Sequence, residues 1–159
     1  MRKQWIGGLI LGLICTYASA GNSTIVLEPK VKINHTCSIK VYNMDFGEVS
    51  PTIDFEGAAL GAVYVLCSNG TNYSVVPNAG YSGNINDRKM KHSTSNDTLS
   101  YTLYSNIINK TKFDDTETGK INYLSNGKEA VHFIRGTIDD RQFVREGSYS
   151  DTLLLTLVW

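Results

Sequence analysis

The stretch EGSYSDTLLLTLVW (146–159) decides the fold class, because a turn-like segment leads into eight residues typical of a strand in a sheet core. No turn, tail or charged cap follows Trp159 in the sequence. An unpaired hydrophobic strand invites pairing with other chains, so proteins rarely leave one uncovered. We therefore expect a further strand beside 152–159.

Alternation divides this strand into two faces. Leu154 and Val158 face neighbouring strands or a partner, and Tyr149 at the strand entry is expected to hydrogen-bond to nearby backbone. Gly147 belongs to the same turn, and Asp151 is predicted to cap or anchor it. The other face is assigned to the core and to the wall of a groove, and it consists of Leu153, Leu155, Leu157 and Trp159.

The opposite terminus carries the features of a secretory signal peptide. Residues 1–20 have a basic start, an apolar run from Ile6 to Ile14 and the small residues Ala18-Ser19-Ala20. The apolar run is well short of the roughly 20 residues that a membrane span needs. We predict cleavage after Ala20 and export of residues 21–159.

Charge and cysteine content agree with an exported structural domain. Removing Arg2 and Lys3 leaves 13 basic residues (15 − 2) against 15 acidic ones, and no basic patch stands out. Nucleic acid is therefore not expected as a partner. Cys37 and Cys67 remain, and they most simply form one disulfide, worth roughly 3.5 kcal/mol in the chain-entropy model.

The body of the chain has the pattern of an all-β protein. Period-2 alternation recurs in three segments, a further segment is rich in β-branched and aromatic residues, and Asn, Gly, Ser and Asp clusters separate these segments. No helical period persists for three turns, so a β-sandwich is predicted, with 78–97 as a long polar loop. Phe46 is expected in the core, and Gly47 in a turn with unusual dihedral angles. The alternating segments are 37–42, 63–67 and 99–104, and the segment rich in β-branched and aromatic residues is 130–138.

A further strand of about ten residues is predicted near the mature N-terminus. Apolar residues recur at every second position of 25–33, but no hairpin turn joins this segment to the strand near Cys37. Pro29 cannot donate to a ladder, which places it at an edge or a non-bonding position. The segment could pair with 152–159 of its own molecule, or it could complete another molecule by strand addition. The pattern alone does not decide between these alternatives.

Several motifs resemble the spore coat protein U family, which includes the subunits of archaic (Csu-type) chaperone–usher pili. The resemblance spans nearly the whole chain after residue 20, and the most specific piece is the G-x-Y-S-D-T element before the terminal strand. The middle of the chain, 108–133, is divergent. The landmarks in order are Cys37, DFGEVSP (45–51), AVYVLC (62–67), DRKM (87–90), LSYTLYSN (99–106) and GSYSDTLLLTLVW (147–159).

The resemblance implies an incomplete immunoglobulin-like sandwich, completed by a donor strand from a neighbouring subunit. It divides the chain into a signal peptide (1–20), a donor-strand extension (21–36) and a pilin domain (37–159). A periplasmic chaperone, an outer-membrane usher and other pilus subunits are the implied partners. The implied fibres mediate attachment and biofilm formation at the cell surface. The implied donor positions are Leu27, Pro29, Val31 and Ile33, and Pro29 departs from the usual aliphatic pattern.

Catalysis is not expected. The three histidines have no nucleophile motif or second ligand at suitable spacing, and the calcium-loop-like DDTETG (114–119) lacks the required glutamate. No cofactor or metal is predicted. Three function classes remain, of which the pilus subunit is preferred. The others are a self-contained secreted coat or matrix protein and a carbohydrate- or surface-binding module.

Overall fold

The computed structural model describes residues 21–49, 57–138 and 141–159. The chain divides into two units, Met1–Ile33 and Asn34–Trp159, which are treated separately below. The second unit begins three residues before the predicted boundary at Cys37. The predicted signal peptide and its cleavage site at Ala20 lie outside the described residues.

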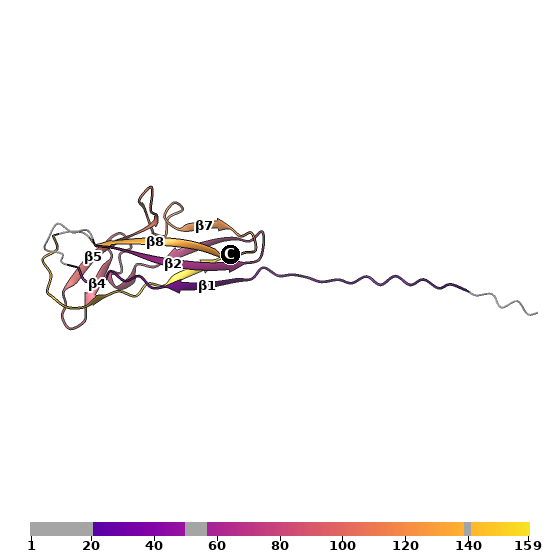
Figure 1. Ribbon diagram of the computed structural model, residues 1–159, viewed down its shortest axis with the longest axis horizontal. Coiled ribbons are helices and arrows are strands. Elements are labelled where there is room, and N and C mark those ends of the chain that lie inside the picture. The colour runs from indigo at the N-terminus through magenta and orange to yellow at the C-terminus, as the bar shows by residue number, and fades with distance from the viewer. Residues whose placement is uncertain (1–20, 50–56, 139–140) are drawn as a thin grey trace, which may run out of the picture. The chain divides into compact units, whose positions relative to one another are not determined.

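The second unit folds as two antiparallel sheets (Figure 1). The larger sheet has the order β1-β2-β8-β5-β4-β9, with β6 pairing on β5, and the smaller has the order β10-β3-β7. A single 3-10 turn, η1, interrupts the strands among the described residues. The elements are β1 (Cys37–Tyr42), β2 (Gly57–Cys67), β3 (Asn72–Pro77), η1 (Gly80–Ser82), β4 (Lys89–His92), β5 (Thr98–Asn106), β6 (Thr111–Lys112), β7 (Ile121–Leu124), β8 (Ala130–Ile138), β9 (Tyr149–Ser150) and β10 (Leu155–Val158).

Alternation in the central strands builds the core between the two sheets. On β2, Val63 and Val65 are fully buried, whereas Leu66, the residue after Val65, points to the outer face and is exposed. Val75 on β3 meets them from the smaller sheet. This period-2 burial confirms the predicted all-β fold class.

One predicted loop contains regular structure. Segment 78–97 includes η1 and the four-residue strand β4, which pairs with β5 and β9. In β4, Met90 and His92 are buried and alternate with the more exposed Lys89 and Lys91. The loop prediction was wrong for these residues. A four-residue strand with lysine at two positions is too short and too polar to stand out from the polar residues around it.

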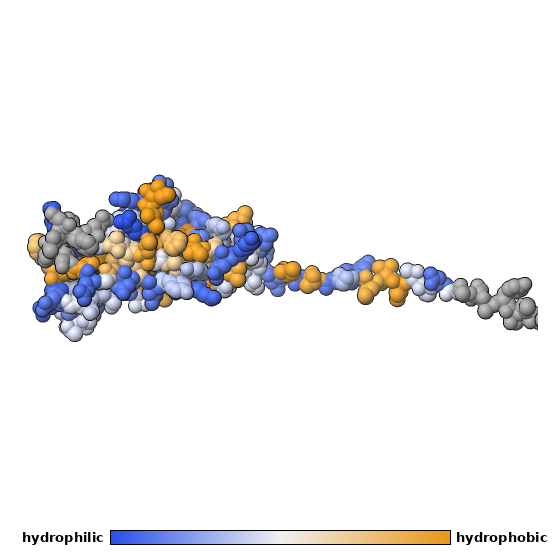
Figure 2. Space-filling model, in the orientation of Figure 1, coloured by the Kyte–Doolittle hydropathy of each residue, from blue (hydrophilic) through white to orange (hydrophobic). Residues whose placement is uncertain are grey.

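The first unit shows no regular secondary structure over 21–33. The strand predicted for 25–33 is therefore not formed, since an isolated extended segment has no neighbour for its backbone hydrogen bonds. Apolar patches alternate with polar ones along it (Figure 2). Four of its side chains are each at least 80% exposed, namely Ile25, Leu27, Val31 and Ile33.

No helix in the parts of the chain that the structure describes is both long and apolar enough to cross a membrane.

Candidate functional site: an open edge of the sandwich

Each sheet ends in a strand that has a neighbour on one side only. Within the described residues, β1 pairs only with β2, and β10 pairs only with β3. The turn 68–71 connects β2 to β3, and 125–129 connects β7 to β8. The orders β1-β2-β8 and β10-β3-β7 therefore run in the same direction, and β1 and β10 border the same side of the sandwich.

We call this side the open edge and define it by the inward-facing side chains of the two border strands and of the residues flanking β10. These side chains belong to the half of the alternating pattern that packs on the core, yet all remain accessible to solvent. They are Ile39, Val41, Leu153, Leu155, Leu157 and Trp159.

Direct pairs across the ladders show how incomplete the core is at this edge. Val41 lies opposite Val63, and it is 51% exposed whereas Val63 is fully buried. Leu157 lies opposite the fully buried Val75 and is itself only partly buried. The residue types are equivalent, so the missing burial reflects a missing neighbour. Trp159, which the sequence placed in the core and groove wall, is 60% exposed.

The backbone of the open edge is also available for pairing. Asn78 N donates to Leu154 O at 2.9 Å, and Pro77, which has no N–H, lies opposite Leu155. Leu154 and every second residue after it therefore direct their N–H and C=O groups toward β3. The alternate residues, Leu155 and Leu157, direct theirs away from β3, into the open edge.

The beginning of β1 is fixed covalently and by hydrogen bonds. Cys37 and Cys67 form the predicted disulfide, which is thus confirmed, and they are ladder partners. Just before them, Ser68 N donates to Thr36 O at 3.0 Å, and His35 Nδ1 lies 2.8 Å from Thr71 Oγ1. These contacts anchor β1 although it has a single neighbouring strand.

The turn before β10 is held by Asp151. Its Oδ1 accepts hydrogen bonds from Tyr81 N at 2.8 Å and Thr152 N at 2.7 Å, and its Oδ2 accepts one from Tyr101 Oη at 2.5 Å. Burial, and then this bond to Asp151, raises the pKa of Tyr101 well above its usual range. A Cβ at Gly80, which has φ +69°, would collide with the Asp151 carboxylate. The sequence pointed to an anchoring role for Asp151 but not to these partners.

Tyr149 and Gly147 belong to the same turn. Tyr149 Oη donates to Arg145 O at 2.7 Å, the kind of backbone contact expected for this tyrosine, and its ring packs edge-to-face on His92. Gly147 has φ +137°, and a Cβ there would collide with the His92 ring. These contacts hold the turn in place and so fix the position at which β10 begins.

Arg88, within the DRKM landmark, is a buried cation whose role the sequence did not reveal. Its Nη1 donates to Phe113 O at 2.9 Å and to Ile85 O at 3.1 Å, and its Nη2 donates to Asn78 O at 3.0 Å. Burial lowers its pKa, and Tyr101 and Asp151 nearby oppose that change. Asn78 Oδ1 in turn accepts from Leu154 N at 3.0 Å. Arg88 thus supports the entry to β10 through Asn78.

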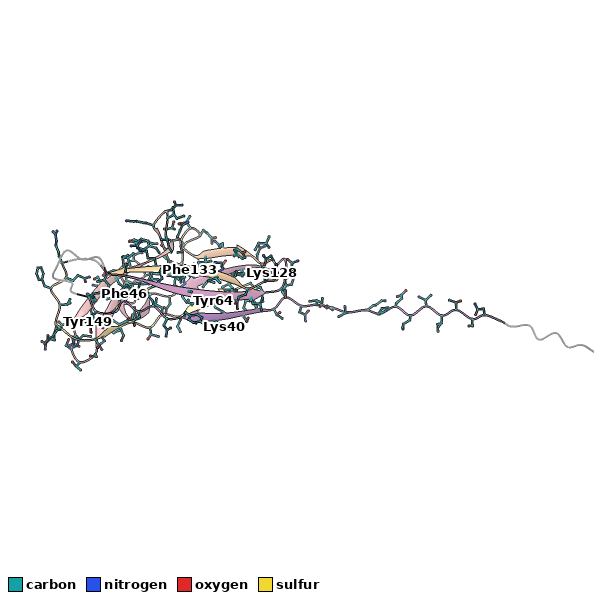
Figure 3. The ribbon with its side chains drawn as sticks, viewed as in Figure 1. Lys40, Phe46, Tyr64, Lys128, Phe133 and Tyr149 are labelled. Carbon is teal, nitrogen blue, oxygen red and sulfur yellow. A yellow bond between two sulfur atoms is a disulfide. The ribbon has the colours of Figure 1, made fainter. Side chains whose placement is uncertain are left out.

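Phe46 and Gly47 lie outside the strands. The Phe46 ring packs edge-on against Tyr101, and Gly136 leaves the space that Phe46 and Met44 occupy. Gly47 has φ +64°, and its N–H donates to Asp45 Oδ1 at 2.8 Å. Phe46 and Tyr149 lie at one end of the domain, and Lys128 lies at the other (Figure 3).

Within 21–49, 57–138 and 141–159, no group of three or more His, Cys, Asp or Glu side chains is placed to hold a metal ion. The site that the geometry presents is thus a strip of apolar side chains beside a free strand edge.

Comparison with known proteins decides the family. Residues 23–156 match the model of the Spore Coat Protein U domain. This chain belongs to the Spore Coat Protein U domain family. A curated relative, Protein U of Myxococcus xanthus, is 24% identical over 157 residues, which cover 89% of this chain and 88% of that protein.

The fold of this Spore Coat Protein U domain is also seen in a solved structure. That structure is the crystal structure of the CsuC–CsuE chaperone–tip adhesion subunit pre-assembly complex from the archaic chaperone–usher Csu pili of Acinetobacter baumannii. The TM-score is 0.63 at 20% identity, over 80% of this chain and 40% of that chain, so this protein spans less than half of the matched chain. The likeness confirms the predicted immunoglobulin-like sandwich.

Proposed function

We propose that this chain is a structural subunit of an archaic chaperone–usher pilus and that it polymerises by donor-strand exchange. The observation that carries the proposal is the open edge. Leu155 and Leu157 face the core but stay partly exposed, and the outer edge of β10 has no partner among the described residues. An apolar segment with period-2 alternation, 25–33, is exposed and unpaired in the same chain.

Strand addition would satisfy both regions at once. The 25–33 segment of a second copy would pair with the free edge of β10, and its donor positions, Leu27, Pro29, Val31 and Ile33, would cover the open edge and the turn that leads into β10. Burying one such aliphatic side chain contributes about 1.5–3 kcal/mol, so several together give a gross gain on the order of 10 kcal/mol. Donor and acceptor surfaces differ, so the contact is head-to-tail and builds a fibre.

A fibre of this kind requires helpers before assembly. An uncovered apolar edge aggregates, so the subunit needs a partner that lends it a strand in transit. A periplasmic chaperone fits this need, and the similar solved structure is itself a chaperone–subunit complex. The proposal therefore includes export by residues 1–20, passage through the periplasm and an outer-membrane usher. Its end point is surface fibres that serve attachment and biofilm formation, a structural role without catalysis.

Light scattering coupled to size-exclusion chromatography tests this function on residues 21–159. We expect the wild-type chain to form polymers or to require a chaperone. Val31→Asp places a charge on the donor face and should leave a monomer, whereas the matched control Lys30→Asp lies on the other face and should still polymerise. A chain truncated to begin at Cys37 should be stabilised by a peptide of residues 22–36.

A stable wild-type monomer whose residues 25–33 are protected from hydrogen exchange would contradict the proposal. The segment would then pair within its own molecule, and the chain would be a self-contained coat or matrix protein, or a binding module of the same fold.

A further inference from the structure

Only some residues of β10 direct their N–H and C=O groups away from β3, and this restricts how a donor strand can pair with it. Leu155 and Leu157 present both their N–H and C=O groups to the open edge, and the same two residues turn their side chains toward the core. In an antiparallel pair, directly opposite residues carry their side chains on the same face of the sheet. The core-facing residues of an antiparallel donor are therefore the ones that exchange two hydrogen bonds with Leu155 and Leu157.

Pro29 conflicts with two of the possible registers. It belongs to the core-facing set of the donor, with Leu27 and Val31, but it has no N–H. Opposite Leu155 or Leu157 it would leave that residue's carbonyl without a donor inside the ladder and press its ring against that carbonyl. Pro29 is compatible with the ladder only beyond either end of β10, opposite Leu153 or opposite Trp159.

The position at which the folded unit of the donor copy begins excludes one of these two registers. If Pro29 lay opposite Trp159, Asn34 would lie opposite Leu154, since antiparallel partners keep a constant sum of residue numbers. The folded unit of the donor copy begins at Asn34, so it would overlap the open edge of the acceptor copy. With Pro29 opposite Leu153, Ile33 lies opposite Tyr149, and Asn34 has passed the whole of β10.

We infer that Pro29 sets the register of donor-strand exchange, with Leu27 opposite Leu155 and Ile25 opposite Leu157 of the neighbouring copy. This inference rests on the proposed function and specifies its geometry. Pro29 then ends the regularly paired part of the donor, and Val31 and Ile33 lie over the turn that Asp151 and Tyr149 hold.

Disulfide trapping on the outer face tests the register without disturbing the core. The proposed register places Val26 opposite Thr156, a non-hydrogen-bonded pair whose Cα atoms are about 4.5 Å apart, within the range for a disulfide. Three matched pairs with Thr156→Cys report the alternatives. Glu28→Cys reports Pro29 opposite Leu155, Lys30→Cys reports Pro29 opposite Leu157, and Lys32→Cys reports Pro29 opposite Trp159.

Fibres assembled from each full-length exported double mutant, 21–159, are oxidised mildly and resolved as covalent ladders. We expect the Val26→Cys/Thr156→Cys chain to cross-link roughly tenfold more than the Glu28→Cys and Lys30→Cys pairs, as an unmade internal hydrogen bond implies. The Lys32→Cys pair should cross-link little, because the two folded units would overlap in that register. Adding Pro29→Ala should raise cross-linking of the Glu28→Cys and Lys30→Cys pairs, because alanine restores the missing N–H.

The outcomes separate the two proposals. Fibres that cross-link mainly through another pair overturn the register while leaving strand exchange intact. A cross-linking pattern that Pro29→Ala does not change overturns the role of Pro29. Absence of fibres from the wild-type chain, in the presence of a chaperone, overturns the proposed function and the register together.

Discussion

Two pairs of facing residues, one in each sheet, compare the centre of the sandwich with its open edge. Val63 and Val75 lie on central strands and are fully buried, whereas their direct partners Val41 and Leu157 lie on border strands and keep contact with solvent. Each pair shares a face and an apolar character. The difference shows that, in these pairs, a core-facing side chain is fully buried only where its strand has neighbours on both sides. The open edge is therefore a part of the core that lacks one covering strand.

The comparison also separates two ways of fixing a strand. Centre strands are held by ladders on both sides, while β1 and β10 depend on contacts at their ends. The disulfide secures β1 at Cys37, and Asp151 with Asn78 secures the entry to β10. The border strands can therefore keep their positions while one edge of each stays unpaired.

The largest expected effect on stability follows from removing the end anchor of β1. Replacing Cys37 and Cys67 together by serine should lower the free energy of unfolding by roughly 3.5 kcal/mol, because a loop of about 30 residues is no longer closed in the unfolded chain. Urea titration of the non-assembling Val31→Asp chain, with and without the two serines, measures this. Hydrogen exchange should increase most in β1, and a loss below about 1 kcal/mol would show that the ladder to β2 fixes β1 by itself.

A smaller and more specific effect compares Val75 with Leu157. Val75→Ala leaves a cavity in the closed core and should cost about 2.5 kcal/mol, whereas Leu157→Ala removes a side chain already in contact with water and should cost about 1 kcal/mol. The order reverses for assembly, because the donor strand is expected to pack on Leu157. Urea titration in the Val31→Asp background gives the first comparison, and polymer yield in the otherwise wild-type chain gives the second. Equal stability losses would contradict the picture of an incomplete core.

The smallest effect concerns pH at the centre of the sandwich. His132 Nε2 lies 2.7 Å from Tyr73 Oη, burial lowers the pKa of His132, and burial raises the pKa of Tyr73 to about 12. The lowered pKa favours the neutral imidazole in the folded protein, and its Nε2 shares a hydrogen bond with the tyrosine hydroxyl. Its unfolded pKa is about 6.5, so below that pH the unfolded chain binds the proton more readily and the free energy of unfolding falls.

Urea titrations of the Val31→Asp chain at about pH 7.5 and about pH 5.5 should show this decrease, and His132→Gln should reduce it. His35 and His92 are present in both chains, so the difference in pH dependence between the two chains reports His132 alone. An identical pH dependence in the two chains would show that His132 does not cause the loss of stability at low pH.

Much of the fold could be predicted from the pattern of apolar and polar residues in the sequence. The segments 37–42, 63–67 and 99–104 lie in β1, β2 and β5, because apolar residues at every second position bury one face of a strand. The segment 130–138, rich in β-branched and aromatic residues, forms β8. The disulfide also followed from composition, since only two cysteines remain after the predicted signal peptide. The sequence likewise separated the inward and outward faces of the terminal strand.

Other features depend on contacts that no local pattern encodes. Arg88 sits in a polar run and reads as a surface residue, yet it is buried because carbonyls from residues 78, 85 and 113 converge on it. The sequence assigned Trp159 to the core and the groove wall, but it could not give the 60% exposure of its side chain, because alternation gives the face of a residue and not whether another strand covers that face.

The Cys37–Cys67 bond has a mechanical consequence. In the proposed fibre, a subunit pulled from its N-terminal side would receive the force at β1 and pass it through a covalent bond to the end of β2. The 29 residues between the two cysteines (67 − 37 − 1) cannot unravel while that bond is intact. At about 3.4 Å per extended residue, this withholds roughly 100 Å of chain from stretching, so each subunit has a built-in limit to its extension under tension.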